Sequence, residues 1–415
     1  MRAAVSRSVR TRVGVAAGSL AGWLSRVTGR GAGATVSGRV LNAIAPGALA
    51  ELAAGRHTAL VSATNGKTTT TRFLAAALAT NGRRVTTNST GANLTSGLAP
   101  TLARDPEADT AVLEVDERVL PRVVDVLGTE LLVLGNLSRD QLDRYGEVHL
   151  VADAWRAVTE ARPHLAVVAN ASDPHVVWAA SPAAVTWVAL GLGWRQDAAT
   201  CPRCGALLAW TADRFACPAC GFAQPDPDFV LEGDALVHAG ERVPLRLAVP
   251  GRWNLANAAL AVAAATTHFD VAAADAAGAL GDVTTVAGRY MRVPLGDGRD
   301  ARVLLAKNPA GWSEVLAFLA GIDTAVVLAV NARVADGKDP SWLWDVPYEL
   351  LRGHATAAAG ERCLDVAVRL RYAEVDHVVE PDPIAAARAL PGDTVHLVCS
   401  YTAFSALYRR YGDRP

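Results

Sequence analysis

Short runs of apolar residues, each ending in polar residues, recur along the chain and suggest buried strands. The clearest runs before the C-terminal third cover 58–62, 110–117, 130–136 and 165–170. Strands covered on both faces of a parallel sheet have nearly continuous apolar runs of this kind. Because longer, helix-compatible segments separate the runs, the pattern predicts an α/β fold with a parallel sheet wound on both faces.

Three later runs, at 301–306, 324–330 and 394–399, predict a second and smaller α/β unit. A chain of 415 residues exceeds one comfortable core, because domains typically hold about 100–200 residues. The expected organisation is an N-terminal segment at 1–45, a central domain at 46–293 and a C-terminal domain at 294–415.

The N-terminal residues combine apolar and basic positions at helical spacing. The apolar positions are Val9, Val13, Ala16, Leu20, Trp23 and Val27, and arginines occupy other faces, which predicts an amphipathic helix. Gly14, Gly18 and Gly22 interrupt the run and no cleavage pattern follows it, so we reject a secretory signal. The preferred role of the helix is packing on the body of the protein. The alternative role is contact between its arginines and anionic lipid.

Charge and apolar content are those of a globular protein. The 40 basic side chains nearly balance the 41 acidic ones, and 51% of the residues are apolar. This balance disfavours disorder and a surface that coats nucleic acid. No run approaches the roughly 18–20 apolar residues needed to cross a bilayer, so we expect no membrane-spanning segment.

Four of the six cysteines form two Cys-x-x-Cys pairs, each followed by glycine. Such turns direct two thiolates to one point, so together they predict a tetrahedral zinc site with the ligands Cys201, Cys204, Cys217 and Cys220. An insert at about 198–224 cannot bury a core, so metal binding would stabilise it, and four thiolates indicate a structural site. A nucleic-acid-binding ribbon is the alternative, although this insert has only Arg203 and Arg214 as bases. The cysteine usage indicates a reducing compartment, the cytoplasm.

A glycine-containing turn follows the first predicted strand. Residues 63–71 are Ala-Thr-Asn-Gly-Lys-Thr-Thr-Thr-Thr, and 72–79 continue as a predicted helix. Backbone amides at such a helix start cradle phosphate oxygens, Lys67 would reach the β- and γ-phosphates, and Thr68 would bind Mg²⁺. The general pattern has an earlier glycine where this chain has Val61. The predicted nucleotide-binding residues of this loop are Thr64, Asn65, Gly66, Lys67, Thr68 and Thr69.

A second polar element ends the next clear apolar run, at Glu114, Asp116 and Glu117. Parallel α/β sheets gather their ligands at the carboxyl ends of the strands. We therefore predict Glu114 as a second magnesium ligand. A solvated acidic strand end is the alternative.

The order and spacing of five segments resemble the Mur ligase family: 64–68, 114–117, 136–146, 170–173 and 251–257. Within that family the chain resembles the MurT type, through the four-cysteine insert, 91–93, 307–311 and 336–345. The likeness runs from about Gly31 onward. The large nucleotide-sugar-binding first domain of other Mur ligases is not expected here.

The resemblance implies a parallel-sheet P-loop ATPase domain of Mur ligase type and an ATP-dependent amidation. MurT-type proteins are the ligase subunit of lipid II isoglutaminyl synthase, which amidates the α-carboxylate of D-glutamate in the peptidoglycan stem peptide. A carboxylate is a poor electrophile, so ATP first converts it to an acyl phosphate, from which ammonia displaces phosphate. The resemblance also places Asn254 and Asn257 near the adenine and Arg289 at the passage to the C-terminal domain. Its membrane-anchored substrate implies work at the inner face of the membrane.

The chain shows no obvious source of ammonia. Cys363 and Cys399 lack the glycine-flanked elbow of a glutaminase nucleophile, and we interpret both as core residues. The resemblance implies a partner, a GatD-type glutamine amidotransferase, whose catalytic triad receives an aspartate from the MurT-type subunit. The candidates here are Asp345, which we prefer, and Asp339. The tryptophans beside them are typical of an interface hot spot, and a surface loop with buried aromatics is the alternative.

The chain departs from the family pattern at two points. Ala63 stands where relatives usually have glycine, so the backbone there must tolerate a Cβ. No lysine lies between Lys67 and Lys307, so the carbamylated lysine that holds a second metal in many Mur ligases is missing. Asp140 or Glu147 are substitutes to consider, and Gln141 replaces a histidine common in relatives.

Two other functions remain in view. An amino-acid-adding Mur ligase or a folylpolyglutamate synthase-like enzyme would turn over an amino acid without a partner. A non-catalytic ATP-binding scaffold would release no phosphate when given substrate.

Overall fold

A computed structural model describes residues 7–28, 33–88, 92–140, 148–191, 194–211, 214–283, 290–296 and 298–412. The chain divides into two compact units. The first unit comprises residues 1–137 and 149–284, and the second comprises 138–148 and 285–415. Each unit has its own main sheet and its own core, and the first unit also has a two-stranded antiparallel sheet of β7 (Ala209–Trp210) and β8 (Phe215–Ala216).

The first unit is built on a nine-stranded sheet. Its spatial order is β11 (Glu241–Pro244), β10 (Ala235–His238), β9 (Phe229–Glu232), β6 (Ala184–Ala189), β5 (Ala166–Asn170), β4 (Leu131–Leu134), β1 (His57–Ser62), β3 (Thr110–Glu114) and β2 (Val85–Thr87). In this spatial order, every pair of neighbours between β9 and β2 is parallel, whereas β10 runs antiparallel to both β9 and β11. The prediction of a parallel sheet is confirmed, and an antiparallel edge is added to it.

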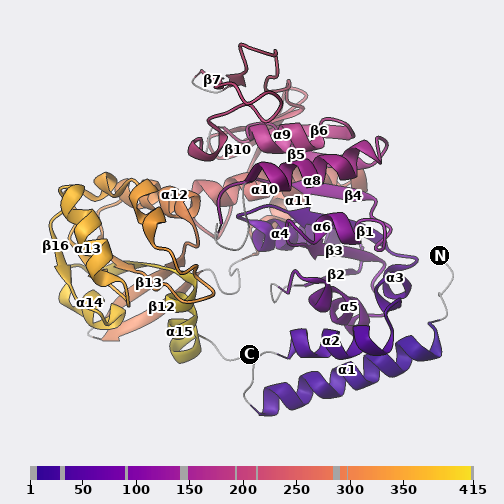
Figure 1. Cartoon of the computed structure of the whole chain (residues 1–415), viewed down its shortest axis with the longest axis horizontal. Helices are drawn as coiled ribbons and strands as arrows, with labels where there is room; N and C mark the ends of the chain where they lie inside the picture. The colour runs from indigo at the N-terminus through magenta and orange to yellow at the C-terminus, as the bar shows by residue number, and fades with distance from the viewer. Residues whose placement is uncertain are drawn as a thin grey trace. The chain divides into compact units, whose positions relative to one another are not determined.

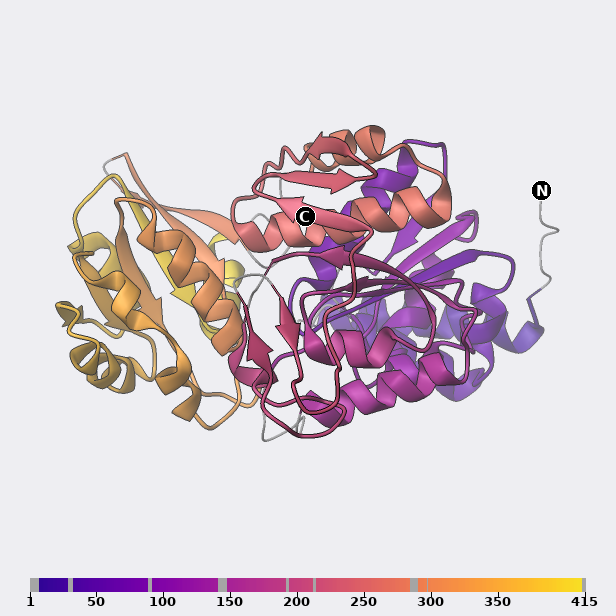
Figure 2. The same ribbon diagram turned by 90° about the horizontal axis from the view of Figure 1, so that it is seen from above.

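Helices cover both faces of this sheet (Figure 2). Helices α10 (Arg252–Phe269) and α11 (Ala273–Leu280) lie on one face and pack against α4 (Lys67–Ala79). Helices α8 (Val148–Glu160) and α9 (Pro174–Ala180) lie on the other face. The remaining helices are α1 (Val9–Val27), α2 (Ala34–Ile44), α3 (Ala48–Ala53), α5 (Thr95–Arg104), α6 (Leu120–Val123) and the 3₁₀ turn η1 (Gln196–Ala198).

The central strands β1, β3 and β4 are buried along almost their whole length, as their apolar runs predict. Leu60, Val112 and Leu132 are fully or almost fully buried. Helix α10 contributes an alanine-rich stretch at 258–265, and these small side chains let it pack closely on its neighbours. A rigid central sheet therefore supports the loops at its carboxyl edge.

The second unit has a six-stranded sheet. Its order is β12 (Tyr290–Gly296), β13 (Arg299–Leu305), β17 (Thr394–Cys399), β14 (Ala325–Ala329), β15 (Thr356–Ala359) and β16 (His377–Val379). All neighbours pair in parallel except β12, which is antiparallel to β13. Its helical segments are α12 (Pro309–Ala320), η2 (Ser341–Asp345), η3 (Tyr348–Leu351), α13 (Cys363–Tyr372), α14 (Pro383–Ala389) and α15 (Tyr401–Tyr411).

The C-terminal unit begins earlier than the boundary expected at 293/294. Strand β12 starts at Tyr290 and pairs with β13 along its length, so the expected boundary falls inside a strand. The segment that starts at Ser138 also groups with this unit. The continuous apolar runs did not reveal β12, because it is an edge strand in which the buried Met291, Val293 and Leu295 alternate with exposed residues.

The N-terminal segment is part of the first unit, where α1 packs on α2 and α2 packs on α5 (Figure 1). The predicted helix and its preferred role, packing on the body of the protein, are both confirmed. The expected apolar positions are exposed, whereas Gly14, Gly18 and Gly22 are buried. The glycines let the two helix backbones approach closely, so the small face makes the contact.

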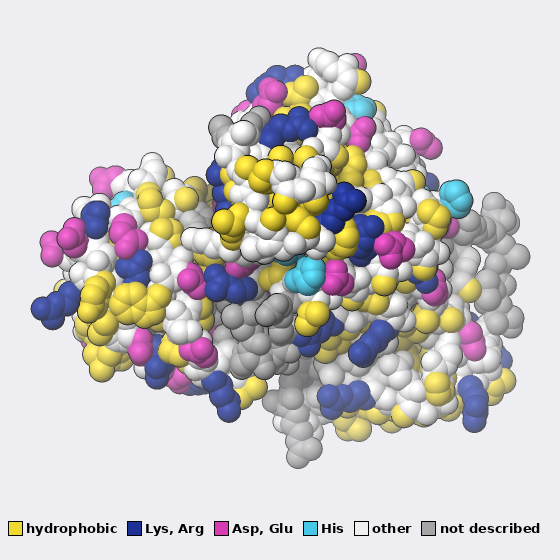
Figure 3. Space-filling model, turned by 45° about the horizontal axis from the view of Figure 1, so that its top comes forward, with side chains coloured by type: hydrophobic (Ala, Val, Ile, Leu, Met, Phe, Trp, Pro, Cys, Tyr) yellow, Lys and Arg dark blue, Asp and Glu magenta, His cyan; other side chains and the backbone are white. Residues whose placement is uncertain are grey.

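Basic and acidic side chains are intermixed on the face drawn in Figure 3. No large field of one sign covers that face, as the balanced composition predicts. Among the described residues, no helix combines the length and apolar character that crossing a bilayer requires.

Candidate functional site

The phosphate loop joins β1 to α4 at the carboxyl edge of the first sheet. Strand β1 ends at Ser62 and α4 begins at Lys67, which confirms the predicted order of strand, loop and helix. Gly66 precedes the helix with a φ of 88°, a left-handed conformation that favours glycine. A Cβ at this position would also collide with the Asn257 side chain. The first amides of a helix have no partner within the helix, so a start such as that of α4 is suited to bind an anion.

The end of β4 holds the loop in place. Asn136 accepts the Thr64 amide through its backbone carbonyl at 2.7 Å, and its side-chain oxygen accepts the Asn65 amide at 3.0 Å. Its side-chain amide donates in return to the Asn65 carbonyl at 2.9 Å. The sequence places Asn136 in a motif but assigns it no role. Its role depends on the parallel pairing of β1 and β4, which brings the two strand ends together.

The departure at Ala63 is accommodated from the neighbouring strand end. Ala63 is buried, and a Cβ on Gly135 would lie 2.8 Å from the Ala63 methyl group. The missing side chain at Gly135 therefore makes room for the one that Ala63 adds. The loop keeps its course without a glycine at position 63.

The Lys67 side chain is buried within the loop that it terminates. Its ammonium donates to the carbonyls of Ala63 and Thr64 and forms an ion pair with Glu117 at 3.0 Å. A phosphate group would compete with Glu117 for this ammonium. Glu117 belongs to an acidic motif in the sequence, but only the fold shows that it is the partner of Lys67.

Thr68 and Glu114 are brought together as predicted. The Thr68 hydroxyl donates to one Glu114 oxygen at 2.7 Å, and the side-chain amide of Asn93 donates to the other at 3.1 Å. Asn88 fixes the backbone by exchanging hydrogen bonds with the Glu114 amide and carbonyl. Hard oxygen atoms in this arrangement suit Mg²⁺, which takes few protein ligands and completes its shell with water and phosphate.

Asn257 lies at the phosphate loop, opposite Gly66. Its side-chain oxygen accepts the Thr70 hydroxyl at 3.2 Å and thereby ties α10 to α4. Asn254 donates from its side-chain amide to the Pro250 carbonyl at 2.6 Å. The role of both residues near the adenine stays a prediction, and Arg289 lies outside the described residues.

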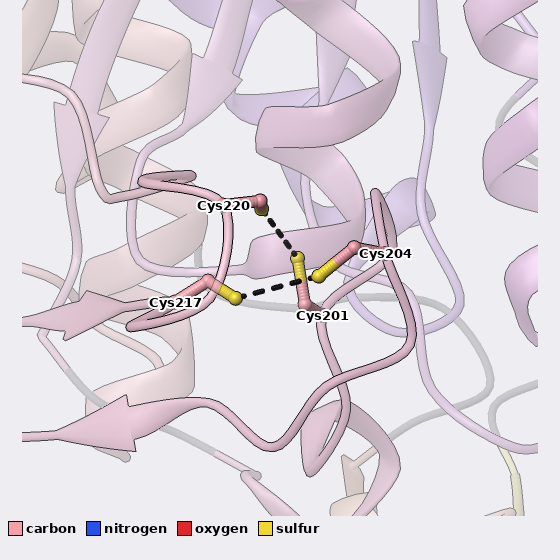
Figure 4. A group of neighbouring side chains, drawn as sticks. All are labelled: Cys201, Cys204, Cys217 and Cys220. Atoms are coloured by element: carbon pink, nitrogen blue, oxygen red, sulfur yellow. Dashed lines mark hydrogen bonds between the residues drawn. The ribbon is translucent and has the colours of Figure 1, made fainter.

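Figure 4 shows the four cysteines of the insert converging from two turns. Their sulfur atoms all lie within 4.8 Å of one another, with Cys201 to Cys220 at 3.7 Å and Cys204 to Cys217 at 3.5 Å. Four sulfurs at about 2.3 Å from one zinc ion would have separations close to these. The predicted cluster is therefore confirmed as a group, and its chemistry fits zinc.

The two turns of the cluster have the same construction. The amide of Gly205 donates to the Cys201 carbonyl, and the amide of Gly221 donates to the Cys217 carbonyl. Both glycines have positive φ, 77° and 73°. Burial raises the pKa of the Cys201 thiol to about 12. A bound cation would reverse that preference and hold the thiolate form.

The cluster is attached to the main body by apolar contacts. Leu208 and Phe215 pack with Val177 of α9 and Trp187 of β6. Of the two bases in the insert, Arg214 is engaged with Asp226 and the Gln224 carbonyl. The insert thus lacks the basic patch that a nucleic-acid ribbon would present.

The second unit contains the two aspartates proposed for the partner. Asp345 is partly exposed and pairs with Arg139 at 3.3 Å. Asp339 is exposed and accepts the amide and the hydroxyl of Ser341, at 2.8 and 2.9 Å, which lowers the pKa of its carboxyl. Both oxygens of Asp339 thus accept hydrogen bonds within its own turn, and the role of either aspartate towards a partner stays a prediction.

The tryptophans next to Asp345 are divided between core and surface. Trp342 packs on the buried Trp312, with ring centroids 5.7 Å apart. Trp344 is exposed and meets Tyr372 edge to face at 5.3 Å. Trp342 therefore lies against the core of the unit, whereas Trp344 lies at its surface.

The remaining predictions have mixed outcomes. Cys363 and Cys399 are both buried, which confirms their interpretation as core residues. Gln141 and Glu147 lie outside the described residues, and Asp140 stays a candidate.

Two family models match the chain. The Mur ligase middle domain matches residues 61–265, and the MurT ligase C-terminal domain matches residues 305–404. A relative in Streptococcus pneumoniae named lipid II isoglutaminyl synthase (glutamine-hydrolyzing) subunit MurT is 29% identical over 409 residues, which cover 88% of this chain and 87% of that protein. This chain belongs to the MurT type of the Mur ligase family.

Solved structures share the fold. A pseudomurein peptide ligase type C from Methanothermus fervidus superimposes with a TM-score of 0.66 at 19% identity, over 84% of this chain and 77% of that one. Mycobacterium tuberculosis folylpolyglutamate synthase, complexed with ADP, gives 0.61 at 16% identity, over 88% and 93%. These likenesses show the Mur ligase fold of the chain.

Proposed function

We propose that this protein is the ATP-dependent ligase subunit that amidates the α-carboxylate of D-glutamate in the lipid II stem peptide. The MurT relative carries this activity in its name, and it matches nearly the whole chain. The observation that carries the proposal is the phosphate loop, with Lys67 at its end and Thr68 in contact with Glu114. A carboxylate does not react with ammonia unaided, so the loop is needed to place the γ-phosphate of ATP where it activates the acid.

In the proposed reaction a carboxylate oxygen of the substrate attacks the γ-phosphorus, and ADP leaves. Ammonia then attacks the carbonyl carbon, and phosphate leaves with one of the original carboxylate oxygens. Lys67 would leave Glu117 for the phosphate oxygens, while the amides at the start of α4 bind the same group. Mg²⁺, held by Thr68 and Glu114, would neutralise phosphate charge.

Zinc is proposed as a structural ion. Four cysteine sulfurs fill a tetrahedral shell, so no position is left for a substrate. The apolar cluster around Leu208 and Phe215 that the insert shares with the main body is small. Zinc binding would therefore supply much of its folding free energy.

Ammonia is proposed to come from a GatD-type glutaminase subunit. Cys363 and Cys399 are buried, and burial raises the pKa of the Cys399 thiol, so neither is a nucleophile. Asp345 would reach the partner's histidine, with Trp344 beside it as an anchor. Lipid II is membrane-anchored, so the pair would work at the inner face of the membrane.

The test is an amidation assay with the chain and its glutaminase co-purified after co-expression. The pair, lipid II, ATP and glutamine should yield an amidated stem peptide, seen as the mass shift from acid to amide. Omitting ATP or glutamine should prevent the reaction. Amino acid incorporation without the partner would instead support an amino-acid-adding ligase, and the absence of phosphate release would support a scaffold.

A further inference from the structure

Helix α1 is attached to the protein by its small residues. Thr11, Gly14, Gly18, Gly22 and Ser25 are its buried positions. A Cβ on Gly18 would lie 2.6 Å from the Ser37 carbonyl oxygen of α2, and a Cβ on Gly14 would lie 2.9 Å from the Leu41 side chain. The contact with α2 therefore needs none of the large apolar side chains of α1.

Those large apolar side chains point to solvent. At about 100° per residue, they form a stripe on the order of 100° wide, centred opposite the glycines. The exposed fractions are 67% for Val9, 53% for Val13, 58% for Leu20, 52% for Trp23, 48% for Leu24 and 65% for Val27. Figure 1 shows α2 between α1 and α5, so that α1 is the outermost of these three helices. A helix of a soluble protein normally buries such an apolar stripe, so we expect this stripe to bind another surface.

Arginines border the stripe. Arg10 and Arg12 are exposed and, at the same helical spacing, fall on its two sides. Helix α1 contains no acidic residue. The Glu51 carboxylate of α3 accepts the Ser8 amide at 2.9 Å, just before the helix, where negative charge stabilises a helix start. The exposed face thus combines an apolar centre with basic edges.

This pattern matches the interface of an anionic bilayer. A helix lying in that interface buries its apolar side chains at the acyl boundary, and its arginines reach the headgroup phosphates. Tryptophan favours the same depth, where its ring is apolar and its N–H stays hydrated. A protein partner of equal fit would need an acidic rim, whereas an anionic membrane supplies negative charge on all sides.

We infer that α1 is an interfacial membrane anchor, which lays the stripe from Val9 to Val27 on an anionic lipid surface. The inference rests on the proposed function, since a lipid-linked substrate is presented at such a surface. The anchor would hold the first unit at the membrane without crossing it.

The test is flotation of the full chain with vesicles. One set contains equal parts of phosphatidylglycerol and phosphatidylcholine, and the other contains phosphatidylcholine alone. The wild type should float with the anionic set and bind the neutral set more weakly. The double variant Leu20→Ser with Trp23→Ser should bind at least about tenfold more weakly, because two inserted apolar side chains are lost. The matched control is Leu150→Ser with Val126→Ser, two exposed apolar positions elsewhere in the first unit, and it should bind like the wild type.

Equal flotation of the wild type and the Leu20→Ser, Trp23→Ser variant would overturn the inference. The inference would also be overturned if the wild type did not bind anionic vesicles but formed a dimer, and the variant were a monomer. The stripe would then join two copies of the chain. Amidation of a water-soluble, short-chain lipid II analogue by the co-purified pair separates the two proposals. The variant should amidate it like the wild type, while failure of both proteins would contradict the proposed function and leave the flotation result unaffected.

Discussion

The Lys67 ammonium lies among the Ala63 and Thr64 carbonyls and the Glu117 carboxylate, at the start of α4. This position serves the γ-phosphate of ATP in the proposed reaction. Replacing Lys67 by alanine should lower kcat for amidation at least about 100-fold, because a charged donor to the transferring phosphate is lost. The measurement is the initial rate with lipid II, ATP and glutamine in the co-purified pair.

The control for Lys67 is Arg122→Ala, a basic residue exposed on α6. It should leave the rate unchanged. Thermal melting of both variants would show that the fold persists. Substantial amidation by Lys67→Ala would remove the phosphate loop from the mechanism.

The buried imidazole of His396 should make the stability of the protein depend on pH. It is buried, its ring accepts or donates a hydrogen bond with Thr324 at 2.9 Å, and burial followed by repulsion from Arg302 lowers its pKa to about 4. The folded protein keeps this ring neutral, whereas the unfolded chain protonates it below about pH 6.5. The free energy of unfolding therefore keeps its full value above about pH 6.5. It decreases by about 3 kcal/mol at most as the pH falls toward 4.

The variant His396→Asn keeps a hydrogen-bonding side chain but does not titrate. Between pH 7 and pH 4.5 its melting temperature should fall less than that of the wild type. Melting curves of the full chain at a series of pH values provide the measurement. Parallel pH dependence of the two proteins would show that another group controls the acid sensitivity.

At the scale of elements, the zinc proposed for the four-cysteine insert can be tested separately from the reaction. Cys204→Ser removes one of four ligands, so the purified variant should lose its zinc and its insert should become sensitive to protease. Cys363→Ala, which changes a buried cysteine outside the cluster, should retain zinc. Elemental analysis of both proteins measures the metal. A full zinc content in Cys204→Ser would contradict the four-cysteine site.

The elements that the sequence predicts well are those with strong local signals. The central strands have continuous apolar runs, and the phosphate loop combines glycine, lysine and threonine at fixed spacing, so β1 and α4 begin and end close to the predicted places. The four-cysteine cluster could also be predicted, because the spacing of the two Cys-x-x-Cys pairs is a local signal. Each of these signals lies within one short segment.

Features that depend on the tertiary fold could not be predicted in this way. Glu117 and Asn136 hold the site through partners about fifty and seventy residues away in the chain. The edge strands β9 to β11 have only four residues each, too few for a clear alternation. The exposed stripe of α1 reverses the ordinary expectation, because glycines form the tighter contact with α2.

At the scale of the whole molecule, the proposed function makes the chain dependent on a second subunit for ammonia. Asp345→Asn should abolish glutamine-dependent amidation, because the partner's histidine would lose its carboxylate. Amidation with a high concentration of ammonium salt should continue. Asp339→Asn, six residues earlier in the chain, is the matched control. It should retain most of its glutamine-dependent rate, since the Asp339 carboxylate accepts hydrogen bonds from Ser341 within its own turn.

The opposite result for the two aspartates would reassign the partner contact to Asp339. Loss of both the glutamine-dependent and the ammonium-dependent rates in Asp345→Asn would mean that Asp345 stabilises the fold through Arg139 instead.

In the proposed reaction, the substrate carboxylate is activated by phosphorylation at the loop that ends at Lys67. The measurement uses lipid II in which both oxygens of the D-glutamate α-carboxylate are ¹⁸O, with the co-purified pair, ATP and glutamine. Mass spectrometry of the released phosphate should find one ¹⁸O atom for each amide formed, because the displaced phosphate takes a carboxylate oxygen with it. Amide formation with unlabelled phosphate would contradict activation of the carboxylate as an acyl phosphate.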